Sequence, residues 1–154
     1  MKLRTLLSLT LAIAISSATF AAEITPPPDA DGAADALKNS PRHGEFKEID
    51  VDGGGAKLKV FETYPERSDK APVIILIHEI FGMTDWTNSV ADALSKEGFI
   101  VVAPDLITGI EGAAENPREA IGKLTPEETL KRLNAPMKYA LTIPSGTGKI
   151  GWVG

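Results

Sequence analysis

A histidine and a glutamate stand side by side at the end of an apolar run, and both side chains can take part in acid–base chemistry. The run Val73–Ile77 contains only Val, Ile and Leu, and His78 and Glu79 follow it directly. Such a run predicts a strand that is covered on both faces, as in a parallel sheet. Ligands bind at the carboxyl ends of these strands, so we expect the site of this protein near His78 and Glu79.

The burial expected of that strand limits what Glu79 can do. A carboxylate at the end of a buried strand must be paired, solvated or protonated, because burying a lone charge is costly. One interpretation is a structural carboxylate that is bonded to nearby backbone or to a basic partner. The other is a polar group that faces a pocket, and the residues alone leave both open.

The elements before the apolar run predict an antiparallel hairpin. Glu45–Val51 and Lys57–Thr63 are typical of strands, and the glycine-rich stretch Asp52–Gly55 between them permits the positive φ angles of a tight turn. A helix is predicted after Gly82, ending near Gly98, and Phe99–Ala103 forms a second buried strand.

This strand–helix–strand order predicts an α/β fold with a doubly wound sheet, mostly parallel apart from the N-terminal hairpin. Asn116 and Thr125 each precede a proline and a carboxylate at the spacing of a helix start. Pro136 predicts a kink or a break in the second of these helices. Lys149–Val153 predicts a third inner strand.

Three motifs together resemble a known family. They are His78-Glu-Ile-Phe-Gly82, Ala103-Pro-Asp-Leu106 and Lys149-Ile-Gly-Trp-Val-Gly154. In their order and spacing the chain resembles the dienelactone hydrolases, a branch of the α/β-hydrolases, from about Pro41 onward. The resemblance implies hydrolysis of a small carboxylic ester or lactone by a Cys or, less typically, a Ser nucleophile through an acyl-enzyme. It implies no metal and no organic cofactor.

The resemblance also implies roles for two residues, and two aromatic residues near them are candidates for contact with the substrate. Glu79 would contact the nucleophilic thiol, and the backbone N–H of Ile80 would be one donor of the oxyanion hole. Phe81 is a candidate substrate contact. Trp86 either lines the mouth of the pocket or anchors its helix in the core, and its helical spacing with Val90 favours the core.

Two polar residues near these are expected to be structural. In this fold the catalytic base follows the nucleophile in the chain, so His78 comes too early for that role and is predicted to brace the loop by hydrogen bonds. Asp105 comes too early to be the acid of the triad and is predicted to fix its own loop.

The chain departs from the family pattern in one motif and lacks a second. Family members carry a substrate-binding arginine soon after the Pro-Asp-Leu motif, but Ile107–Gly112 contains none, which argues against an anionic lactone as substrate. The nucleophile would follow two residues after Gly154, with the acid and base later still. The chain would then hold the N-terminal portion of an α/β-hydrolase domain, incomplete at its C-terminus.

Two other functions are considered beside the hydrolase. A non-catalytic binding protein with the same fold is favoured if neither Cys nor Ser stands two residues after Gly154. A nucleotide-binding α/β domain would need a glycine-rich loop after Ile77, where the chain has His78 and Glu79.

Composition and the N-terminus predict an exported protein. Lys2 and Arg4 precede the apolar stretch Leu6–Ile15, and small residues lead to a cleavage site after Ala21. We therefore assign residues 1–21 to a signal peptide, 22–43 to a mobile leader and 44–154 to the domain, and expect a periplasmic location. Cleavage makes the net charge of −5 more negative by two, which disfavours nucleic-acid partners and stable membrane association.

Ligands for a metal are scarce in the sequence. There is no cysteine, and the two histidines, His43 and His78, lie far apart. No His, Asp and Glu residues have the spacing of a metal site. The sequence leaves the oligomeric state open.

The 154 residues expressed by themselves should be largely insoluble and inactive on aryl esters. An apolar strand with an unpaired edge promotes aggregation, and no triad would be present. Expression followed by size-exclusion chromatography and an aryl-ester assay checks this expectation. A soluble monomer that turns over esters would contradict it.

Overall fold

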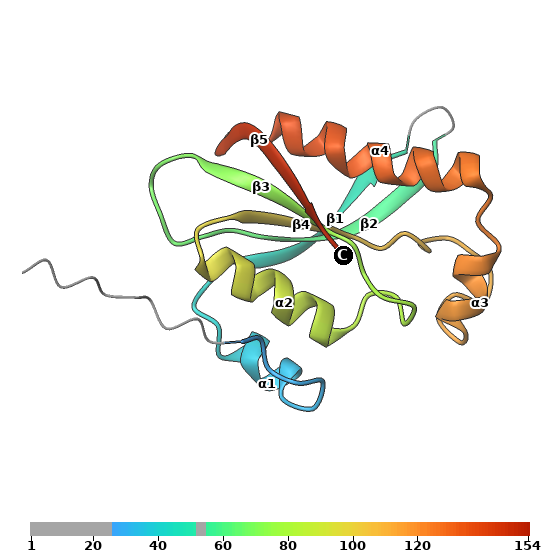
Figure 1. Ribbon diagram of the computed structural model, residues 1–154, viewed down its shortest axis with the longest axis horizontal. Helices are drawn as coiled ribbons and strands as arrows, with labels where there is room; N and C mark the ends of the chain where they lie inside the picture. Colours follow the sequence, from blue (N-terminus) through green and yellow to red (C-terminus); the bar gives the residue numbers. More distant parts are fainter. Residues whose placement is uncertain (1–25, 52–54) are drawn as a thin grey trace, which may run out of the picture.

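The computed structural model describes residues 26–51 and 55–154, so the predicted signal peptide, the start of the leader and most of the hairpin turn lie outside the described residues. The elements follow one another as a mixed α/β chain (Figure 1). They are α1 (Ala33–Lys38), β1 (Gly44–Asp50), β2 (Lys57–Thr63), β3 (Ala71–Leu76), α2 (Asp85–Lys96), β4 (Ile100–Pro104), α3 (Pro117–Gly122), α4 (Pro126–Thr142) and β5 (Gly146–Val153).

The described strands form one mixed sheet in the order β1-β2-β4-β3-β5. β3 pairs in parallel with β4 and with β5, while β2 pairs antiparallel with β1 and with β4. The predicted hairpin and the predicted β3–α2–β4 unit are therefore confirmed. The α/β class is confirmed as well, with parallel pairing among β3, β4 and β5 and antiparallel pairing in the N-terminal hairpin and between β2 and β4.

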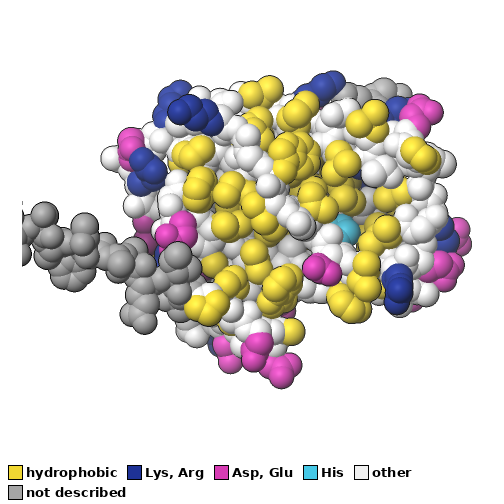
Figure 2. Space-filling view, viewed as in Figure 1, with side chains coloured by type: hydrophobic (Ala, Val, Ile, Leu, Met, Phe, Trp, Pro, Cys, Tyr) yellow, Lys and Arg dark blue, Asp and Glu magenta, His cyan; other side chains and the backbone are white. Residues whose placement is uncertain are grey.

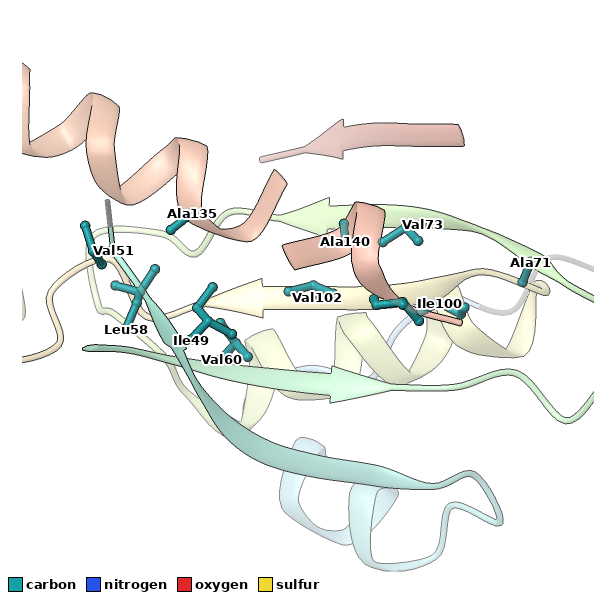
Figure 3. Close-up of a cluster of buried hydrophobic side chains, with 11 residues drawn as sticks. Ile49, Val51, Leu58, Val60, Ala71, Val73, Ile100, Val102, Ala135 and Ala140 are labelled. Atoms are coloured by element: carbon teal, nitrogen blue, oxygen red, sulfur yellow. The ribbon is translucent and has the colours of Figure 1, made fainter. Parts of the chain in front are cut away.

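Side chains along β3 and β4 point alternately to the two faces of the sheet, and this explains why both strands are apolar throughout. Val73 in β3 and Val102 in β4 pack toward α4, together with Ala135 and Ala140 of that helix (Figure 3). The intervening residues of the same strands point to the opposite face and pack around Ala91 of α2. Because successive strand side chains point to opposite faces, helices on both sides require every position to be apolar.

The helix starts confirm the capping predictions for Asn116 and Thr125, and Thr84 caps α2 as well. The side chain of Thr84 accepts the backbone N–H of Thr87, and Asn116 and Thr125 accept those of Glu119 and Glu128 in the same way. These bonds satisfy donors that a helix leaves free in its first turn. Pro136 does not split α4, which runs as one helix, and its side chain is fully buried. Burial of this part of α4 against the sheet offsets the lost hydrogen bond.

The prediction of a mobile leader over residues 22–43 is wrong for its second half. Ala33 of α1 is fully buried, and the helix packs against α2. Beyond the helix, Ser40 donates a hydrogen bond of 2.6 Å to Asp92, and the guanidinium of Arg42 makes a part-buried ion pair with the same carboxylate. The polar and proline-rich composition of residues 22–43 did not predict these contacts, because they depend on Asp92 of α2, some fifty positions later in the chain.

β5 was predicted as an inner strand but lies at the edge of the described sheet. It pairs with β3 alone, and most of its residues are exposed, including Trp152 and Val153. Figure 2 shows hydrophobic side chains gathered across the middle of the face on which Figure 1 draws β5 in front. None of the helices in residues 26–51 and 55–154 is long and apolar enough to cross a bilayer.

A buried carboxylate ties the hairpin to α4. The side chain of Glu62 in β2 is fully buried, and its Oε2 lies 2.7 Å from Lys47 Nζ of β1. The same oxygen accepts a 2.7 Å hydrogen bond from the hydroxyl of Tyr139 in α4. Desolvation lowers the pKa of Lys47, but hydrogen bonds to Glu45, Glu62 and Tyr64 outweigh it and hold that pKa well above its usual range. Lys47 therefore stays charged beside Glu62.

Replacing Glu62 with Ala should lower the free energy of unfolding by about 2 kcal/mol. The change leaves a part-buried lysine and a tyrosine hydroxyl without their shared acceptor. Glu48→Ala, an exposed site on the same hairpin, is the matched control and should change stability by less than about 0.5 kcal/mol. Urea unfolding of the whole protein followed by circular dichroism measures both. Equal stability of the two variants would contradict the role given to Glu62.

Candidate active site

A tight turn at the carboxyl end of β3 presents the candidate residues. The N–H of Gly82 donates to the carbonyl of Glu79 at 3.0 Å. Gly82 has a φ of +71°, and a Cβ there would lie 3.1 Å from Ile107. Glycine is required at this position because it tolerates both the left-handed backbone and the close approach. The turn leaves the side chains of Ile80 and Phe81 exposed, at 41% and 68%.

The backbone N–H of Ile80 differs from that of Gly82 in having no hydrogen-bond acceptor among the described residues. The amide of Gly82 closes the turn, whereas no acceptor within the described part of the chain binds the amide of Ile80. A free N–H at the first central position of a turn can donate to an oxygen that comes from outside. This is the property that an oxyanion donor needs.

His78 holds the turn in place. Its side chain is 1% exposed, and its Nε2 accepts the backbone N–H of Leu106 at 3.1 Å. Nε2 therefore carries no proton, so Nδ1 bears it and donates to the carbonyl of Glu79 at 2.7 Å. The ring thus joins the loop after β3 to the loop after β4, and the predicted bracing role of His78 is confirmed.

Hydrogen bonds to Asp105 and from Arg132 hold the loop after β4. Asp105 Oδ1 accepts the N–H of Ile107 at 3.3 Å, as a loop-fixing carboxylate should. Its distance of 3.9 Å from His78 Nε2 is too long for a hydrogen bond. Nη1 of Arg132 in α4 donates to the carbonyls of Leu106 and Thr108 at 3.0 and 2.8 Å. No sequence pattern predicted this contact of Arg132, because helical spacing alone does not tell which loop lies across from a helix.

A hollow of about 710 Å³ lies beside the turn. It brings together Glu79, Phe81 and Trp86, which were singled out from the sequence. Trp86 is 38% exposed and lines this hollow, although its spacing favoured a place in the core. Gly82 of the same motif as Glu79 and Phe81 lines it too, together with residues that no motif indicated: Asp29, Ala30, Thr84, Asp85 and Thr87. Asp29 and Ala30 come from the segment that was predicted to be a mobile leader.

A second hollow, of about 460 Å³, shares Phe81 and Gly82 with the first and extends along the loop after β4. Neither lining contains Lys or Arg, so no basic side chain replaces the arginine missing from the family motif. Arg118, the nearest arginine in sequence, is exposed on α3. Within residues 26–51 and 55–154, no group of three or more His, Cys, Asp or Glu side chains is placed to hold a metal ion.

Comparison with known proteins gives consistent matches. The sequence is 33% identical over 94 residues to a carboxymethylenebutenolidase of Pseudomonas putida, covering 54% of this chain and 40% of that protein. It is 30% identical over 97 residues to carboxymethylenebutenolidase 1 of Cupriavidus pinatubonensis, covering 56% and 42%. The chain thus spans about two fifths of the length of these curated relatives.

Comparison of structures agrees at the level of the fold. The crystal structure of a dienelactone hydrolase from Anabaena variabilis superposes with a TM-score of 0.54 at 18% identity, over 72% of this chain and 50% of that one. The sequence model of the dienelactone hydrolase family matches residues 58–154, which include the turn, the loop after β4 and β5. Because this model matches more than half of the chain, the chain belongs to the dienelactone hydrolase family.

Proposed function

We propose that the whole protein hydrolyses carboxylic esters or lactones. The observation that carries the proposal is the unpaired N–H of Ile80 on a braced turn at the carboxyl end of β3, in a chain of a hydrolase family. The relatives named carboxymethylenebutenolidase support this class of reaction. A non-catalytic binding protein, the alternative, has no need of a free amide at that point.

In the proposed mechanism a Cys or Ser nucleophile attacks the ester carbonyl, and negative charge develops on the carbonyl oxygen. The Ile80 amide donates a hydrogen bond to that oxygen. Such a donor is effective because it is fixed before the reaction begins. His78 supplies this fixation, since it holds the carbonyl of Glu79, the residue before the amide. Expulsion of the alcohol leaves an acyl-enzyme, which water then hydrolyses.

Glu79 and the aromatic residues have secondary parts in the proposal. The exposed carboxylate of Glu79 lines the larger hollow, where a nucleophilic thiol could come into contact with it. Phe81 and Trp86 offer exposed rings to the substrate in the same hollow. No metal or organic cofactor takes part in these steps.

Ile80→Pro in the whole protein should lower kcat for an aryl ester by about 100-fold, the usual effect of losing one oxyanion donor. Proline has no N–H, yet it suits the first central position of this turn, where φ is negative. Ile80→Ala keeps the amide and is the matched control, with kcat expected within about threefold of the parent. Steady-state kinetics of both variants measure the effect, and equal losses in the two would contradict the oxyanion role.

We also propose that the protein is exported and is periplasmic. The basic residues Lys2 and Arg4, the apolar stretch after them and the small residues up to Ala21 support this proposal. N-terminal sequencing of the protein purified from a periplasmic extract should give a chain that begins at Ala22. A protein that keeps Met1 and stays with the cytoplasmic fraction would contradict export.

A further inference from the structure

The N-terminal segment before β1 forms part of the wall of the larger hollow. Asp29 and Ala30 line it, although both lie outside residues 58–154, which the family model matches. The segment has fixed contacts. Asp29 Oδ1 accepts the N–H of Gly32 at 2.9 Å, and the buried Ala33 follows directly. Further along, Arg42 binds Asp92 of α2. This chain therefore adds a wall that the matched family region does not supply.

The lining of this hollow is acidic and aromatic. Its charged side chains are three carboxylates, those of Asp29, Glu79 and Asp85, and no Lys, Arg or His belongs to the lining. Phe81 and Trp86 add exposed aromatic rings, whose faces attract cations. Near a protein surface a carboxylate repels an anionic ligand and attracts a cationic one by similar amounts. The same hollow thus opposes anions and accommodates cations.

We propose that Asp29 is a specificity-determining residue that makes the protein prefer esters with a cationic group over neutral ones, and neutral esters over anionic ones. This inference rests on the proposed ester hydrolysis. The hollow lies beside the Ile80 turn, so the part of the substrate that occupies it is joined to the reacting carbonyl. The acidic segment then selects against carboxylate-bearing substrates, in agreement with the lack of a basic side chain in either hollow.

The test uses three p-nitrophenyl esters with acyl chains of equal length, ending in a trimethylammonium, a methyl or a carboxylate group. In the whole protein, kcat/KM should fall in that order. Asp29→Asn should reduce the ratio of kcat/KM for the cationic ester to that for the anionic ester by about three- to tenfold, since it removes one charge at the hollow. Added salt should shrink the ratio of the parent by screening.

Asp31→Asn is the matched control, because Asp31 is exposed in the same turn and does not line the hollow. It should leave the ratio within about twofold. No hydrolysis of the neutral ester would overturn the proposed function and this inference together. Turnover of the neutral ester with a preference for the anionic one, or equal ratios in Asp29→Asn and Asp31→Asn, would overturn the inference and leave the function standing. Circular dichroism verifies that both variants are folded.

Discussion

The arrangement of the site depends on the hydrogen bonds that the buried ring of His78 makes. The ring binds the loop after β3 and the loop after β4 at once, through the carbonyl of Glu79 and the amide of Leu106. Both of these backbone groups lie just beyond strands that are buried on two faces. Without the ring the amide of Leu106 would lose its hydrogen-bond acceptor, and the carbonyl of Glu79 would keep only the N–H of Gly82. The histidine thus fixes two loops without taking part in the proposed chemistry.

Rigidity of the turn matters because the proposed catalytic group is part of the backbone. An amide can stabilise developing charge only if it already points toward it, and a mobile turn would lose much of that advantage. Three features limit the motion of this turn: the ring of His78, the Gly82–Glu79 hydrogen bond and the close approach of Gly82 to Ile107. Arg132 adds a link from α4 to the loop on the other side. The exposed side chains of the turn remain free to meet a substrate.

The sequence predicted the central elements well because their signals are local. An uninterrupted apolar run indicates a strand between two layers of helices, and a capping residue before proline indicates a helix start. Predictions failed where the deciding partner lies far along the chain. Ala33 is buried because α2 lies against it, and Trp86 lines a hollow because the segment around Asp29 lies beside it. No local pattern encodes such contacts.

The sequence by itself determined the fold class, the family and the position of the turn that carries Ile80, because strand periodicity and the His78-Glu79 motif are written in neighbouring residues. Only the tertiary structure decided which tautomer His78 adopts, which amide remains unpaired and which side chains face the same hollow. Each of these depends on distances between residues that are remote in sequence, such as His78 and Leu106. The acidic wall around Asp29 belongs to this second group, since folding alone brings the segment before β1 to the end of β3.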